Sequence, residues 1–170
     1  FWLHIVENLG SGVDQYIFHG RNIASNDALK ILFANGKLEI EIVSTSGLSN
    51  KYVWAIPSFA ILKWYHCIIS WSGRFTEDPK LYINAAEVTI NSATRNETTD
   101  RNRRTIKELM LFDAFAASAD YELVGGLAEF AIFNSNFSSV DAEEIYNNGE
   151  DFNALKHTRA VNLVDYWRLG

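Results

Sequence analysis

The sequence has little of what stabilises many small secreted domains. It contains one cysteine, Cys67, and two prolines among 170 residues. A single cysteine excludes an intrachain disulfide, so a buried core has to supply the stability. The scarcity of proline and the lack of any repeat argue against a flexible linker or a repeat architecture. A chain of this length can bury one substantial core, and we expect a single domain over residues 1–170.

Long apolar runs and an excess of positive charge are also missing. No segment approaches the roughly 20 apolar residues that cross a bilayer, and residues 1–6 lack the basic start and small-residue cleavage site of a signal peptide. The net charge is −6, which argues against nucleic acid or an anionic membrane as a partner. The chain begins without Met, and we expect it to be part of a longer protein.

Aromatic side chains, at 14% of the sequence, favour the pleated, half-buried surfaces of strands. Short apolar runs alternate with polar turns along the whole chain, as in sandwiches and barrels. The strongest hairpin signal is Asn35-Gly36, which suits a type I′ turn. The runs that predict strands are 1–6, 15–20, 28–34, 37–43, 51–54, 64–71, 80–84, 86–91, 105–112, 121–133 and 163–169. Residues 92–104 carry no large apolar side chain and predict an exposed loop.

One segment predicts a helix, within residues 138–148. Ser138 and Asp141 have the spacing of a capping box. Acidic residues in the first turns suit the positive end of the helix dipole, and Gly149 supplies a stop.

Four segments in order carry a resemblance to a known family. They are Trp64-Tyr65-His66 followed by CIISW and KLYINAAEV, the run from Gly125 to Phe133, FSSVDAEEIYNNG at 137–149, and LVDYWRLG at the end. Together they resemble the laminin G-like and pentraxin-like branch of the concanavalin A-like lectin/glucanase superfamily. The resemblance implies an all-β fold, a two-sheet antiparallel jelly-roll sandwich with one short helix near 138–148.

The sequence departs from the family pattern in two places. Ala85 follows Asn84 where the family has glycine, so we expect a longer or differently shaped turn. The family's usual first strand is absent before the Trp-bearing one, which predicts an uncovered edge at Trp2. LVDYWRL would fill part of that gap, and another segment or subunit would cover the rest, including Trp167. We therefore expect the isolated chain to associate and to belong to a larger assembly.

Enzymes of the superfamily are glycosidases, which use paired carboxylates. Glu39 and Glu41 lie on one face of a strand, roughly 7 Å apart, but Val43 occupies the third position of the glucanase-like motif. We interpret both glutamates as a solvated outer face and expect no enzyme activity.

The sequence gives little support for a metal site or a reactive thiol. The histidines, His4, His19, His66 and His157, lack the spacings of a zinc site, and Cys67 sits among apolar neighbours as a small hydrophobe. No cofactor is expected. Calcium stays open without a placed site, since scattered loop acids could supply oxygen ligands: Asp14, Asp78, Asp100, Asp113 and Asp120.

Two sets of residues are candidates for binding. Tyr52 and Trp54 lie beside a predicted loop and could stack on a sugar, with core packing as the alternative. The arginines Arg95, Arg101, Arg103 and Arg104 form a basic loop that could face a subunit or an acidic glycan, with simple solvation as the alternative.

Function then rests on family analogy. The first hypothesis is a non-catalytic carbohydrate-binding or adhesion module of a secreted, cell-surface or virion protein, with a glycan or another protein subunit as partner. The alternative is a structural or decoration module of a phage or viral particle without a small ligand. A glycoside hydrolase is the third, and its acids do not fit.

Overall fold

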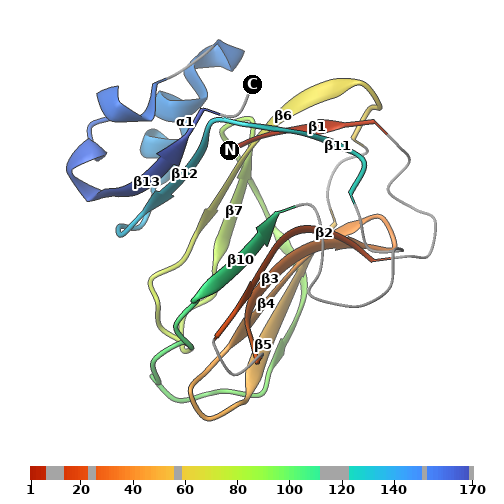
Figure 1. Cartoon of the computed structure of the whole chain (residues 1–170), viewed down its shortest axis with the longest axis vertical. Helices are drawn as coiled ribbons and strands as arrows, with labels where there is room; N and C mark the ends of the chain where they lie inside the picture. Colours follow the sequence, from red (N-terminus) through yellow and green to blue (C-terminus); the bar gives the residue numbers. More distant parts are fainter. Residues whose placement is uncertain (7–13, 23–25, 56–58, 112–122, 151–152, 169–170) are drawn as a thin grey trace.

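The computed structural model describes residues 1–6, 14–22, 26–55, 59–111, 123–150 and 153–168, and they form two large antiparallel sheets with one α-helix. The five-stranded sheet has the order β11 (Gly125–Ala128), β1 (Trp2–Ile5), β6 (Lys63–Ser70), β7 (Lys80–Ile83) and β8 (Ala86–Val88). The six-stranded sheet has the order β10 (Glu108–Leu111), β2 (Gln15–Arg21), β3 (Asp27–Ala34), β4 (Lys37–Val43), β5 (Ser49–Trp54) and β9 (Ile90–Arg95). Figure 1 shows the two sheets as separate layers, which confirms the predicted β-sandwich.

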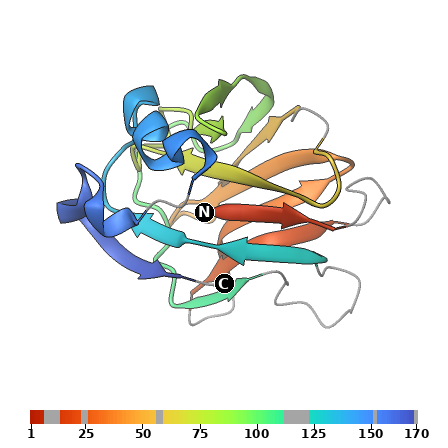
Figure 2. The ribbon, with the colours of Figure 1, turned by 90° about the horizontal axis from the view of Figure 1, so that it is seen from above.

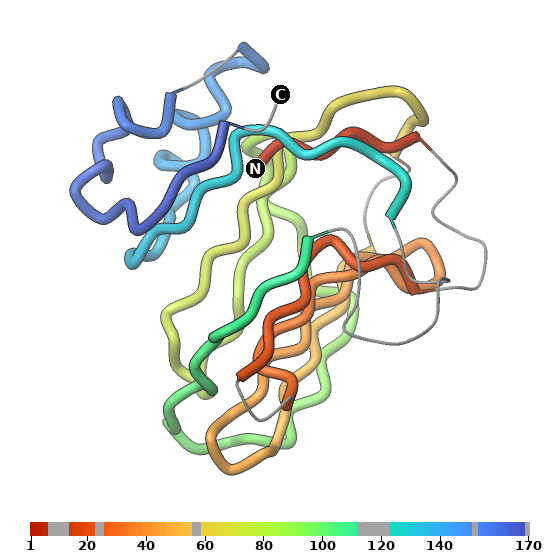
Figure 3. Tube along the Cα trace, viewed as in Figure 1, coloured from red at the N-terminus to blue at the C-terminus, as the bar shows by residue number. Residues whose placement is uncertain are grey.

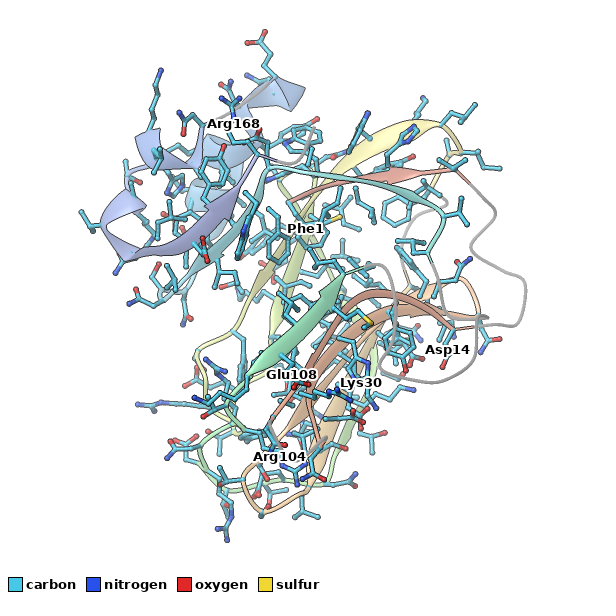
Figure 4. All side chains as sticks on the ribbon, in the orientation of Figure 1. Phe1, Asp14, Lys30, Arg104, Glu108 and Arg168 are labelled. Atoms are coloured by element: carbon cyan, nitrogen blue, oxygen red, sulfur yellow. The ribbon has the colours of Figure 1, made fainter. Side chains whose placement is uncertain are left out.

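Strand alternation builds the core between the sheets. In β4, Leu38, Ile40 and Ile42 are buried, and they meet Leu3 and Cys67 from the opposite sheet in one apolar cluster. Side chains of both sheets project into the space between the layers, with Phe1 near one end and Arg104 at the other (Figure 4). No helix in the described part of the chain is long and apolar enough to cross a membrane.

Two hairpin turns use left-handed residues. Asn35 and Gly36 have φ values of 50° and 70°, which confirms the predicted type I′ turn between β3 and β4. Asn84 and Ala85 have φ values of 48° and 68° and join β7 to β8 just as tightly. The expectation of a longer turn was therefore wrong: alanine occupies the position at a cost of about 1–2 kcal/mol.

The predicted loop at residues 92–104 is a strand in its first part. β9 pairs with β5 through Asn50↔Arg95 to Trp54↔Ile90. Backbone groups alone form such a ladder, so a stretch without large apolar side chains can still add an outer strand. The predicted exposure holds for most of residues 92–104, but Glu97 is 3% exposed. The pairing of β9 with β5 was not predicted.

The predicted strand over residues 121–133 is interrupted. Glu129 has a φ of 49° and turns the chain from β11 into β12 (Phe130–Phe133). Figure 3 shows this continuous path. β12 pairs with β13 (Leu163–Trp167) in a separate two-stranded sheet. The segment predicted as one strand is therefore divided between two sheets; residues 121 and 122 lie outside the described part.

The opening strand is an interior strand. β1 pairs with β11 on one side and β6 on the other, and Trp2 packs on His66 with ring centroids 5.0 Å apart. The uncovered edge expected at Trp2 is thus absent, and the final strand pairs with β12 instead of β1. Trp167 lies 5.4 Å from Phe130 and stays 36% exposed.

The predicted helix is α1 (Ser139–Tyr146), and its capping box between Ser138 and Asp141 is confirmed. It ends at Asn147, in the left-handed conformation, two residues before Gly149. Three 3₁₀ turns follow: Asn147–Gly149, Ala154–Lys156 and Ala160–Asn162. Ala142 and Ile145 of α1 pack with Ile68 and Tyr82 of the five-stranded sheet.

Candidate functional site

The five-stranded sheet has an outer face, turned away from the six-stranded sheet, of which α1 covers one half. Figure 2 looks onto this face: the blue helical segment lies over one end of β6, beside the start of β1, and no helix of the described residues lies over the other ends of β1, β6 and β11. The covered half contains Ile68 and Tyr82, both buried. The bare half contains Trp64, His4 and Gly126, which the strand register places side by side.

Trp64 and His4 form a stacked pair on the bare half. Their ring centroids lie 5.0 Å apart with an interplanar angle of 27°, and Trp64 is 47% exposed. The indole also extends over β11, where a Cβ on Gly126 would lie 3.1 Å from its outermost ring carbon. Glycine at this position thus lets a large aromatic surface lie along the sheet.

Glycine is required next door for a different reason. A Cβ on Gly125 would lie 2.3 Å from the carbonyl oxygen of His4, a separation that only a backbone shift can relieve. The glycine pair, which carried part of the family resemblance, therefore lets β11 lie close to β1 and leaves room for the Trp64 ring over Gly126.

The aromatic surface continues to the edge of α1. Trp2 lies 5.8 Å from Tyr146 and, like it, is half-buried. We call Trp2, His4, Trp64 and Tyr146 the outer strip. Beneath it lies His66, 3% exposed, and burial lowers the pKa of His66 to about 2. This imidazole is therefore neutral at physiological pH and serves as a packing surface.

Apolar side chains border the outer strip at its bare end. Val6, Ile61, Leu62 and Val124 are between 36% and 69% exposed. The Leu62 amide donates to the Ile5 carbonyl at 2.7 Å, and the Val6 amide donates to the Val124 carbonyl at 3.4 Å. These bonds fix three chain segments next to one another, so the bare half presents one continuous aromatic and apolar surface.

The predicted sugar-binding pair, Tyr52 and Trp54, lies inside the core. The two residues are 1% and 0% exposed, because the register of β4 with β5 pairs them with Ile40 and Leu38. Burial raises the pKa of the Tyr52 hydroxyl. Neither ring can receive a sugar, and the core alternative is the correct one.

The two glutamates of β4 are held in ion pairs. Glu39 pairs with Lys51, and the Glu41 Oε2 lies 3.2 Å from the Lys30 Nζ. Burial disfavours the charged Lys30, but its bonds to Asp27 and Glu41 outweigh this and raise its pKa. The carboxylates thus belong to cross-strand ion pairs on the face of β4 opposite the core-facing Leu38, Ile40 and Ile42. The sequence interpretation placed them on this outer face but as solvated groups, whereas the Glu39 side chain is only 13% exposed.

The four arginines of the predicted basic loop make different contacts. Arg95 donates from Nε to Asp78 at 2.8 Å, and the Arg101 Nε lies 3.3 Å from the Glu97 Oε2. Arg104 donates to the Asp27 carbonyl at 3.1 Å. Arg103 has no ion pair with any described residue and lies at the rim of an internal cavity. The arginines therefore do not act as one patch.

The histidines, the cysteine and the loop acids form no metal site in the described residues, where no group of three or more His, Cys, Asp or Glu side chains gathers. Cys67 is buried, and burial raises the pKa of its thiol to about 12, which fits its interpretation as a small hydrophobe. Asp78 pairs with Arg95, and Asp100 accepts from Thr76 at 3.1 Å. Asp14 precedes β2 (Figure 4), while Asp113 and Asp120 lie outside the described residues.

Sequence reasoning missed Trp64, although a signal was present. The alternation in residues 64–71 places Tyr65, Cys67 and Ile69 on one apolar face, and the structure packs all three against the main core. Trp64 falls on the opposite face. An aromatic side chain out of phase with the core-facing set is a candidate for surface recognition.

Comparison with known proteins gives a likeness in fold. No family model matches the sequence, and no curated protein matches it. The receptor-binding domain of botulinum neurotoxin mosaic serotype C/D, solved with tetraethylene glycol on its Hcn sub-domain, aligns with a TM-score of 0.59 at 18% identity, covering 86% of this chain and 35% of that one.

Two further structures align similarly. The botulinum neurotoxin serotype D ligand-binding domain in complex with N-acetylneuraminic acid gives a TM-score of 0.57 at 15% identity, covering 86% of this chain and 34% of that one. The binding domain of Paraclostridial Mosquitocidal Protein 1 gives 0.58 at 13% identity, covering 88% and 36%. The chain thus spans about a third of the length of these neighbours. It shares the β-sandwich fold of part of three toxin binding domains.

Proposed function

We propose that this chain is a non-catalytic carbohydrate-binding module whose site is the outer strip. The observation that carries the proposal is the exposed indole of Trp64, stacked on His4 above Gly126. Aromatic faces pack against the apolar C–H surfaces of sugars, while neighbouring polar groups orient the hydroxyls. The His4 imidazole and the Tyr146 hydroxyl are the polar groups of the strip.

The comparisons support a binding function that includes carbohydrate. The neighbours are receptor- or ligand-binding domains, and one of them was solved with a sugar. The order of the sequence motifs supports a single laminin G-like domain of the concanavalin A-like group. A module of this type belongs on a secreted, cell-surface or virion protein, where glycans are accessible.

A glycan array tests the proposal. The wild-type chain should bind a defined set of glycans, and Trp64→Ala should abolish that binding while its unfolding transition stays unchanged. Trp167→Ala removes another partly exposed indole, from β13, and should leave the binding intact. Absence of binding by the wild-type chain, or equal binding by Trp64→Ala, would refute the site.

A second candidate function is the structural or decoration module of a particle. It is favoured by the apolar residues Val6, Ile61, Leu62 and Val124 next to the strip, since contiguous exposed apolar surface is typical of protein contacts. In that case the array stays blank and the chain self-associates. Leu62→Ser should then return it to a monomer in sedimentation velocity.

A further inference from the structure

A cavity of about 280 Å³ lies between the two large sheets, beside the β12–β13 ribbon. Its walls are mostly aliphatic and aromatic, with Ile31 and Ile42 from the six-stranded sheet, Cys67 and Ile69 from β6, and Phe130 and Ile132 from β12. The volume is close to the lower end for ligand pockets, roughly 300–1,000 Å³. A slender apolar group is the occupant that such walls accommodate.

Two charged side chains line the cavity, Arg103 and Glu129. The amino group of Phe1, another lining residue, donates to the Cys67 carbonyl at 3.1 Å. Glu129 is already neutralised, because it accepts from Tyr166 and lies 3.1 Å from the Arg168 Nε. Arg103 forms no ion pair or side-chain hydrogen bond with any residue that the structure describes. The cavity therefore has mostly apolar walls, and among the described side chains that line it Arg103 is the cation without an acidic partner.

Arg103 differs in this respect from the other arginines near it in the sequence, each of which has a partner. Arg101 has Glu97 and Arg95 has Asp78 as acidic partners, and Arg104 is bound to a backbone carbonyl. Arg103 is held in place by the backbone bridge between its own residue and Ser44 of the adjacent turn. Its guanidinium thus extends from a fixed backbone and has no side-chain partner among the described residues.

We propose that the cavity binds an amphiphile composed of an alkyl chain and a single carboxylate, with the chain between the sheets and the carboxylate on Arg103. The planar guanidinium matches a carboxylate with two parallel hydrogen bonds, and burying the chain removes apolar surface from water. This site adjoins the outer strip at Trp2, which lines the cavity, but the proposal does not rest on the proposed glycan binding.

Isothermal titration with decanoate, kept below its micelle concentration, tests the proposal. The wild-type chain should bind one decanoate. Arg103→Gln should weaken decanoate binding about tenfold, as expected for the loss of one charge-assisted contact, and should leave the binding of 1-decanol unchanged. Arg101→Gln, two residues away in the same loop, is the matched control and should bind decanoate like the wild type.

Two cavity-filling variants complete the test. Cys67→Leu and Ile69→Phe enlarge side chains that line the cavity, so each should weaken binding of both probes at least about tenfold while keeping or raising the melting temperature. Trp64→Ala should not affect either probe. The proposal is overturned if the wild type shows no saturable binding, if both filled variants bind as well as the wild type, or if Arg101→Gln and Arg103→Gln lose decanoate equally.

Discussion

The two halves of the outer face of the five-stranded sheet share strand β6 and differ in what covers them. In one half, Ile68 and Tyr82 are buried beneath α1, where they pack against Phe137 and Ile145. In the other, Trp64 is 47% exposed and stacks on His4 of the neighbouring strand. The comparison teaches that alternation along a strand decides which residues share a face, whereas a segment far away in the sequence decides whether that face is core or surface.

The largest expected change in unfolding free energy comes from one of the two glycines of the bare half. Gly125→Ala should cost about 3 kcal/mol of unfolding free energy, because the new Cβ meets the His4 carbonyl and forces β11 away from β1. Gly126→Ala should cost less than about 1 kcal/mol, since the contact is with the end of a side chain that can tilt. Urea unfolding measures both.

Equal costs for the two glycine variants would contradict this division of roles. Gly126→Ala should still reduce ligand binding to the outer strip, because it displaces the Trp64 ring while the sheet stays folded.

A smaller effect is expected on the covered half, where α1 is held by charge. The Arg159 guanidinium at 2.6 Å, together with the Ser138 hydroxyl and amide, holds the pKa of Asp141 well below its usual value. A carboxylate with a lowered folded pKa stabilises the protein above its unfolded pKa, about 3.9, and this contribution is lost as the pH falls below that value.

Asp141→Asn should therefore cost about 1.5 kcal/mol at pH 7 and much less at pH 2.5. Melting temperatures measured from pH 6 to pH 2.5 should fall more steeply for the wild type than for the variant. A constant difference between the two proteins over that range would show that the Asp141 charge does not anchor the helix.

The smallest effect is expected at the β7–β8 turn, at the edge of the sheet beyond the covered half. Ala85→Gly should stabilise the protein by about 0.5 kcal/mol, because relief of the left-handed alanine exceeds the added entropy of the unfolded chain. Ala86→Gly, one residue later in β8, is the control and should destabilise by a similar amount. A loss of stability in Ala85→Gly would mean that the turn is not strained.

Much of the fold could be predicted from the sequence, because its signals are local. The alternation in residues 37–43, the Asn35-Gly36 turn and the Ser138–Asp141 capping box each act within a few residues. The break at Glu129 could not be predicted in this way, since a left-handed glutamate is held there by Tyr166 and Arg168, which lie 37 and 39 positions away.

The sequence predicts an aromatic binding site, but it points to Tyr52 and Trp54, which are buried, and not to Trp64. Trp54 and Trp64 both stand in short apolar runs. The pairing of β5 with β4 and β9 turns Trp54 into the core, whereas the position of α1 leaves Trp64 uncovered. Neither fact is encoded near the tryptophan itself.

The most direct test measures stability and ligand binding together in one variant from each half. Ile145→Ala, on the covered half, should lose about 2–3 kcal/mol of unfolding free energy and keep its affinity for the glycan found with the wild-type chain. Trp64→Ala, on the bare half, should keep its stability within about 0.5 kcal/mol and lose that affinity. If Trp64→Ala instead loses stability and retains binding, the bare half is a packing surface and the account of the outer strip is wrong.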